Sequence, residues 1–165
     1  VELGNAAYDA REHRSRASAP VSIRIDAIGL MPVSVLPVGV TPDGALAVPG
    51  AADVGWYRFG AAPKETGSVV LAAHVAFNGV DGPFRHLGDV ARGDEVVVAL
   101  DDGTERRYRV DELTSYRKEA LPDAVWAKGG GERLVLVTCG GRFDSERRRY
   151  DDNVVAWASP VNIVS

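Results

Sequence analysis

The sequence predicts an all-β domain, either a barrel or a sandwich, on three observations. About eight short apolar segments follow one another along the chain, as in small antiparallel barrels and sandwiches. Turns that contain Gly or Pro separate these segments at intervals of about ten residues. In the first segment Val21, Ile23 and Ile25 alternate with polar residues, which is typical of a strand with one buried face.

The elements follow from where each apolar run starts and stops. Gly29 and Pro32 end the first strand, and the Asp-Asp-Gly sequence at 101–103 is a hairpin turn signal. We expect one helical turn over 84–87 and a short helix over 120–126. The expected strands, in chain order, cover residues 21–25, 67–74, 95–100, 106–113, 133–139 and 153–158. Shorter extended pieces are expected over 33–38 and 46–48, and the stretch 53–59 carries Trp56, Tyr57 and Phe59.

The chain length of 165 residues suits one compact domain with a complete core. Residues 1–19 are polar and rich in Ala and Arg, so we expect a linker or a peripheral helix there and the folded domain over 20–165. The chain begins at Val1 without Met, and no apolar run approaches the roughly 20 residues of a membrane-spanning helix. We therefore expect a processed or truncated ectodomain whose signal or anchor has been removed.

Composition excludes several classes of function. The formal net charge is −4, so a basic face for nucleic acid is not expected. With one cysteine the chain forms no intramolecular disulfide and no Cys-rich zinc site. The glycine-rich motifs of nucleotide-binding loops are missing from the sequence. We expect no metal and no cofactor.

Two apolar strands end in residues that can carry chemistry. One run stops at His74, and the other stops at Thr138 and Cys139, followed by two glycines that let a substrate backbone approach closely. A lone Cys is either a buried, inert thiol or a nucleophile. A histidine beside it can accept the thiol proton and generate the reactive thiolate.

The other candidates are less well placed. His13 lies in the polar N-terminal segment, and His86 follows a turn, where a surface role is expected. Four arginines crowd the segment after Cys139: Arg142, Arg147, Arg148 and Arg149. They form either a solvated basic loop or the source of a guanidinium that stabilises an oxyanion.

The chain resembles the sortases over about residues 20–160, and within them the class E/F enzymes of actinobacteria. An apolar strand that ends in Thr-Cys-Gly-Gly, with an upstream strand that ends in Ala-His-Val, is the most specific part of the match. The matching stretches, in the family's order, are VSIRI (21–25), AIGL (27–30), VGWY (54–57), GSVVLAAHV (67–75), FRHL (84–87), GD (93–94), LVLVTCGG (134–141) and DNVV (152–155).

The resemblance implies an eight-stranded β-barrel with short helices, tethered to the extracellular face of the bacterial cell membrane. It implies that Cys139 attacks the threonine carbonyl of an LPxTG-like sorting signal and that His74 is the acid/base partner. Thr138 and Gly140 would contact the substrate. An amine from a cell-wall cross-bridge or a pilin lysine would then accept the acyl group.

Two positions depart from the family pattern. Ala76 replaces the aspartate that commonly follows the histidine motif, and Asp151 stands where related sequences often have an arginine. We assign the catalytic arginine to Arg149, which would share the face of Asp151 in a continuous strand, with Arg148 as the alternate.

Two other functions are compatible with parts of the sequence. One is a non-catalytic binding module with a sortase-like barrel, which the departures at Ala76 and Asp151 favour. The other is an L,D-transpeptidase of the cell wall. Those enzymes carry a Gly before the Cys, whereas Thr138 precedes Cys139 here.

Overall fold

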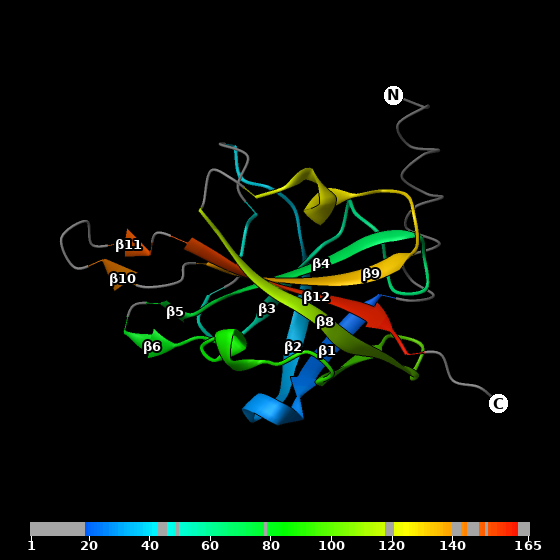
Figure 1. Ribbon diagram of the computed structural model, residues 1–165, viewed down its shortest axis with the longest axis horizontal. Coiled ribbons are helices and arrows are strands. Elements are labelled where there is room, and N and C mark those ends of the chain that lie inside the picture. The colour runs from blue at the N-terminus through cyan, green and yellow to red at the C-terminus, as the bar shows by residue number, and fades with distance from the viewer. Residues whose placement is uncertain are drawn as a thin grey trace.

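A computed structural model describes residues 19–42, 46–48, 50–77, 79–117, 121–139, 143–144, 149–150 and 152–161. The expected N-terminal linker or helix over 1–19 lies outside these residues except for Ala19. Eight strands close into a barrel in the order β1-β2-β3-β4-β9-β12-β8-β7, which confirms the expected fold (Figure 1). Their bounds are Pro20–Ile25, Leu30–Val38, Val54–Tyr57, Gly67–His74, Glu132–Cys139, Asp152–Pro160, Glu105–Arg117 and Glu95–Leu100, in that order.

Two small hairpins and three 3-10 turns complete the described structure. The hairpins are β5 (Ala76–Phe77) with β6 (Val80–Asp81) and β10 (Phe143–Asp144) with β11 (Arg149–Tyr150). They lie at the same end of the barrel, on the left of Figure 1. The 3-10 turns are η1 (Asp26–Ile28), η2 (Leu87–Asp89) and η4 (Asp123–Trp126). No helix among the described residues is long and apolar enough to cross a membrane.

Alternation along each strand separates an inner core from an outer apolar cluster. On β4, Val69 and Leu71 belong to the core inside the barrel, while Val70 and Ala72 belong to the outer cluster. Successive side chains of a strand point to opposite faces, so a strand that is apolar throughout must be covered on both sides. The outer cluster covers β4, β9 and β12 and is made of Val70, Ala72, Val125, Val135, Val137 and Val155, with Leu46, Val48, Tyr57, Tyr116, Leu121 and Trp157 packed against it.

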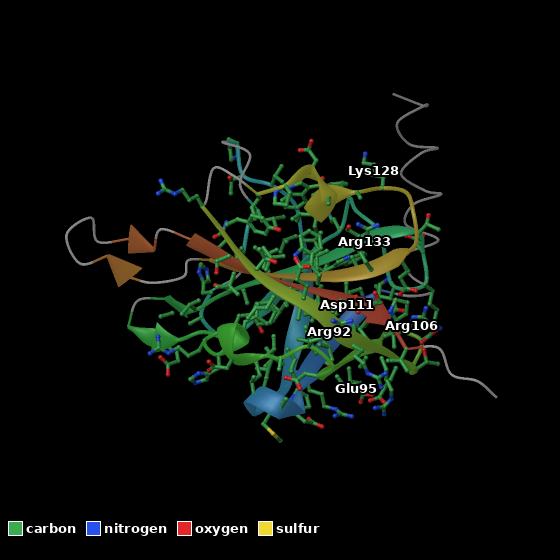
Figure 2. All side chains as sticks on the ribbon, in the orientation of Figure 1. Arg92, Glu95, Arg106, Asp111, Lys128 and Arg133 are labelled. Carbon is green, nitrogen blue, oxygen red and sulfur yellow. The ribbon has the colours of Figure 1, made fainter. Side chains whose placement is uncertain are left out.

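Glu132 organises a polar network at the start of β9. Its carboxylate accepts hydrogen bonds from the Arg106 guanidinium, from Tyr108 Oη (2.6 Å) and from the Lys64 main-chain N–H (3.0 Å). Burial alone would raise the pKa of the Glu132 carboxyl, but the hydrogen bonds from Arg106 and Tyr108 hold it below its ordinary value. Burial, and then the bond to Glu132, raise the pKa of Tyr108. Figure 2 shows Arg106 at the end of the barrel opposite β5 and β6.

Several expected boundaries were wrong. The segments 76–81, 143–144 and 149–150 were not expected as strands, and β8 continues beyond residue 113 to Arg117. The expected helix over 120–126 is the shorter 3-10 turn Asp123–Trp126. The turn expected over 84–87 is closed by a hydrogen bond from the Leu87 N–H to the Phe84 carbonyl (3.1 Å), and the 3-10 turn Leu87–Asp89 follows it.

Pro32 was expected to end a strand, but it lies inside β2, which continues through both Pro32 and Pro37. This strand pairs with β1 up to Ser34 and with β3 from Val35 onward. Each proline therefore has a partner strand on one side only, so its missing N–H does not break a ladder on both sides.

Candidate active site

His74 and Cys139 are neighbours across two parallel strands. β4 and β9 pair in register along their whole length, from Gly67 opposite Glu132 to His74 opposite Cys139. Adjacent strands lie about 4.8 Å apart, so the two residues occupy adjoining backbone positions where both strands end. The structure therefore brings together the two residues that the sequence singled out for chemistry.

Both positions belong to the outer face of the barrel. His74 follows Val70 and Ala72 at intervals of two, and position 139 follows Val135 and Val137 in the same way. The His74 side chain is partly buried. An apolar strip along β4 and β9 thus leads directly to the histidine and cysteine positions.

The 3-10 turn η4 covers this strip from outside. Val125 is fully buried in the outer cluster, and Ser68 Oγ on β4 donates a hydrogen bond to the Ala124 carbonyl (3.0 Å). Trp126 packs edge-on against Tyr57 of β3, with 5.6 Å between the ring centroids. These contacts involve Ser68 on β4 and Tyr57 on β3, so η4 covers the part of the strip that precedes the histidine and cysteine positions.

Sequence reasoning missed the covering residues Tyr57, Val125 and Trp126. Their signal is weak, because the sequence predicts only a short helix over 120–126 and indicates nothing about which strands it covers. Which sheet face a short turn will cover depends on strand order. Strand order is a non-local property that a single-sequence pattern does not contain.

Thr138 points to the other side of β9. It is 1% exposed and alternates with Leu134 and Leu136, whose side chains lie in the barrel core. The expected contact of Thr138 with substrate is therefore restricted to its backbone. Gly140 lies outside the described residues, and its expected role stays a prediction.

The arginine assignment also stays a prediction. Arg149 lies in β11 opposite Asp144 of β10, and β12 begins only at Asp152. Position 151 lies outside the described residues, so the continuous strand on which the assignment of Arg149 rests also stays a prediction. Arg148, Arg142 and Arg147 lie outside the described residues. The β10–β11 hairpin lies between β9 and β12 in the chain, so Arg149 belongs to the connection that follows Cys139.

The remaining histidines are placed as follows. His86 is exposed, with its Nδ1 3.4 Å from a carboxylate oxygen of Asp89, so it lies on the surface as expected. His13 is outside the described residues. In the part of the chain that the structure describes, no three His, Cys, Asp or Glu residues gather closely enough to hold a metal ion.

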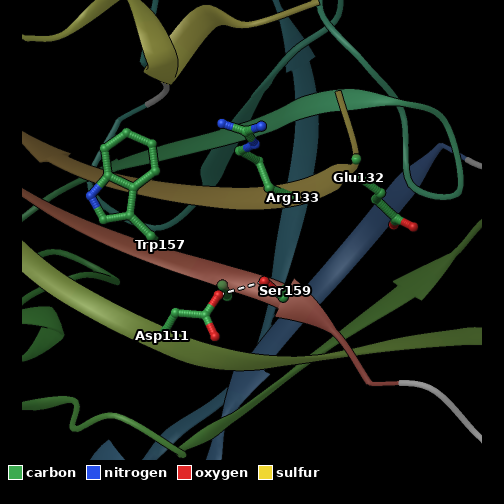
Figure 3. A pocket seen from close by; sticks show the side chains of 7 residues that line it. Asp111, Glu132, Arg133, Trp157 and Ser159 are labelled. Atoms are coloured by element: carbon green, nitrogen blue, oxygen red, sulfur yellow. Dashed lines mark hydrogen bonds between the residues drawn. The ribbon is translucent and has the colours of Figure 1, made fainter. Parts of the chain in front are cut away.

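A cavity of about 350 Å³ lies away from the histidine and cysteine positions. It is lined by Gly131 and by the first residues of β9, Glu132 and Arg133, whereas Cys139 is the last residue of that strand. Figure 3 shows Trp157, Arg133 and Asp111 around it, with Asp111 hydrogen-bonded to Ser159. The cavity therefore belongs to a separate region of the surface.

Solved structures of sortases share this fold. Sortase C1 of Streptococcus agalactiae aligns with a TM-score of 0.67 at 18% identity, covering 87% of this chain and 68% of that chain. A lid mutant of sortase A from Corynebacterium diphtheriae aligns with a TM-score of 0.68 at 18% identity, covering 88% and 71%. The Clostridium perfringens sortase D5 transpeptidase aligns with a TM-score of 0.64 at 19% identity, covering 87% and 79%.

Comparison of the sequence with known families identifies the family of the chain more specifically than the fold does. A search of curated proteins finds no match to this chain. The sortase domain family, by contrast, matches residues 23–161, which include every strand of the barrel except the first residues of β1. The barrel and the extent of this match together show that the chain belongs to the sortase family.

Proposed function

We propose that this sortase is a cysteine transpeptidase that cleaves an LPxTG-like sorting signal between Thr and Gly. The acyl group is then transferred to an amine on the cell surface. The observation that carries the proposal is the register of β4 with β9, which sets His74 opposite Cys139 at the end of an apolar strip. A thiol with a histidine neighbour is the arrangement that nucleophilic acyl transfer requires.

The first half-reaction forms an acyl-enzyme. The Cys139 thiolate attacks the threonine carbonyl carbon, and the carbonyl π electrons move to the oxygen. When the tetrahedral intermediate collapses, the C–N bond to glycine breaks and His74 donates a proton to the departing amine. The products are a thioester on Cys139 and a peptide with a free glycine amine.

In the second half-reaction His74 accepts a proton instead of donating one. An incoming amine loses a proton to His74 as its nitrogen attacks the thioester carbonyl, and the C–S bond then breaks to regenerate the thiolate. The guanidinium of Arg149, with Arg148 as the alternate, stabilises the oxyanion of both tetrahedral intermediates. The backbones of Thr138 and Gly140 contact the substrate beside the nucleophile.

The proposed class of sortase rests on sequence motifs, and the proposed cellular location rests on membership of the family. The Ala-His-Val and Thr-Cys-Gly-Gly sequences and the VGWY stretch support a class E/F sortase of the actinobacterial type. Membership of the family supports a place at the cell surface. We propose that the enzyme acts on the extracellular face of the membrane, with a cell-wall cross-bridge or a pilin lysine as acceptor.

A fluorogenic LPxTG peptide with a glycine-based amine acceptor tests the proposal. The wild-type chain is expected to release the C-terminal fragment and to yield the acyl–amine product by mass spectrometry. Cys139→Ala is expected to yield neither, with an unchanged circular dichroism spectrum. Full cleavage by Cys139→Ala would refute the proposal. A wild-type chain that binds the peptide without cleaving it would favour the non-catalytic binding module.

A further inference from the structure

The chain that leaves β4 turns back and lies against His74. After the β5–β6 hairpin it forms a return segment, residues 82–84, that hydrogen-bonds to the end of β4. The Gly82 N–H donates to the Val75 carbonyl (2.8 Å), and the Phe84 N–H donates to the His74 carbonyl (3.3 Å). Two backbone hydrogen bonds thus hold the main chain directly after the His74 α-carbon, on either side of the Val75 α-carbon.

The return segment is fixed to the barrel by its last residue. Phe84 is fully buried and lies in the core, as does Leu87 three residues later. β3, the other neighbour of β4, pairs only with Leu71 and Ala72. Beyond Ala72 the return segment therefore supplies hydrogen bonds that hold the last part of β4 in place.

Only glycine fits at position 82. A β-carbon built there would lie 2.0 Å from the His74 carbonyl oxygen and 2.6 Å from its carbonyl carbon. Both atoms belong to the main chain, so no side-chain rotation relieves the overlap. A β-carbon at Gly88, further along the same connection, meets nothing within 4 Å. The close approach to His74 is thus specific to Gly82.

We infer that Gly82 is a positioning residue, which holds the main chain of His74 at the level of Cys139. This inference rests on the proposed function, in which His74 moves protons for Cys139. Gly82 itself touches neither the substrate nor the reacting atoms. It lets the return segment sit directly on the histidine backbone, so that β9 and the return segment both determine where His74 lies.

A side chain at position 82 would disturb this arrangement in either of two directions. The end of β4 could move away from the return segment, which displaces His74 relative to Cys139. Alternatively, the return segment could move toward a cavity of about 180 Å³ lined by Ile28, Leu30 and Pro83. That movement would break the hydrogen bonds to Val75 and His74. In both cases the position of His74 changes.

Gly82→Ala tests the inference in the full chain. We expect kcat for the sorting peptide to fall about 10- to 100-fold, because a displacement of about 1 Å costs that much in an oriented reaction. KM is expected to stay within about twofold, because substrate contacts are unchanged. The rate at which iodoacetamide alkylates Cys139 is also expected to fall, because the thiol loses its oriented imidazole.

Two control variants separate positioning from general destabilisation. Gly88→Ala introduces a β-carbon into open space and is expected to match wild type in every measurement. Gly67→Ala lies at the opposite end of β4, where a β-carbon would meet the Ala127 carbonyl oxygen at 2.8 Å and φ is +104°. It is expected to lower the melting temperature without changing kcat or the alkylation rate of the folded protein.

The outcomes are distinct. Wild-type kcat and alkylation rate in folded Gly82→Ala would overturn the inference, as would a rise in KM with unchanged kcat. If Gly82→Ala does not fold, Phe84→Leu decides, because it loosens the anchor of the return segment without adding a clash. A lower kcat and alkylation rate in this variant support the inference, and wild-type values overturn it. If the wild-type chain cleaves no peptide, the proposed function fails, and alkylation still measures the effect of Gly82.

Discussion

His74 and Cys139 are Cα partners in the register of β4 with β9, at the last residue of each strand. The strands run parallel, and residues 75–131 of the chain connect them. Closure of the barrel brings the two residues together, because β4 and β9 are adjacent in the closed order.

The first prediction concerns the pH dependence of catalysis. Because one thiol and one imidazole act together, kcat/KM for the sorting peptide is expected to be bell-shaped in pH, with apparent pKa values that belong to the pair. His74→Ala is expected to lower kcat/KM by about 10²- to 10⁴-fold. His86→Ala is the control, since His86 is exposed, and it is expected to leave the profile unchanged. A His74→Ala enzyme with wild-type kcat/KM would contradict the assignment.

The second prediction separates the two arginines. If Arg149 stabilises the oxyanion, Arg149→Ala is expected to lower kcat by about 10²- to 10³-fold, which is the usual cost of removing one oxyanion donor. Arg148→Ala is expected to change kcat much less. The measurement is steady-state kinetics with the fluorogenic peptide. A larger loss of kcat in Arg148→Ala would assign oxyanion stabilisation to Arg148. Unchanged kcat in both variants would exclude both arginines from this role.

The third prediction concerns Glu132. Glu132→Gln is expected to lower the free energy of unfolding by about 1–3 kcal/mol at pH 7, because a buried carboxylate that bonds to Arg106 and Tyr108 is replaced by a neutral amide. The measurement is denaturant unfolding. The pKa of Glu132 is lowered from 4.5 in the folded protein, so its charge stabilises the fold above that value. The stabilisation is lost as pH falls through the folded pKa.

The difference between wild type and Glu132→Gln is therefore expected to shrink below pH 4.5. Glu105→Gln is the matched control. Glu105 is exposed, and its ion pair with Arg107 spans 3.3 Å at the surface, so a change within about 0.5 kcal/mol is expected. A pH-independent difference for Glu132→Gln would show that the charge of Glu132 does not contribute.

The fourth prediction concerns the cover over β4 and β9. Val125 is fully buried, so Val125→Ala is expected to lower the free energy of unfolding by about 1–3 kcal/mol. Hydrogen exchange is expected to become faster first at Ser68, whose N–H donates to the Ala127 carbonyl at the end of this turn. Asp123→Ala, at an exposed neighbouring position, serves as the control. Unchanged exchange at Ser68 in Val125→Ala would contradict the role of Val125 as the anchor.

The sequence predicts long strands accurately and very short strands not at all. The strands expected over 67–74 and 95–100 agree with β4 and β7 residue by residue, because long apolar runs between Gly-containing turns give a clear signal. The β5–β6 and β10–β11 hairpins consist of two-residue strands, which are too short to show a period of two. The extension of β8 beyond residue 113 follows from its pairing with β12, as Asp152 lies opposite Arg117.

The sequence by itself determined the all-β class of the protein, its long strands β4 and β7, and the identity of its candidate nucleophile and acid/base partner. All of these depend on local patterns, namely the alternation of side chains along a strand and a reactive residue after an apolar run. The tertiary structure alone decided that β4 and β9 are adjacent, that His74 lies opposite Cys139, and that Gly82 packs against the histidine main chain. The physical reason is that these contacts join segments distant in the chain, and their geometry is set only when all eight strands close into one barrel.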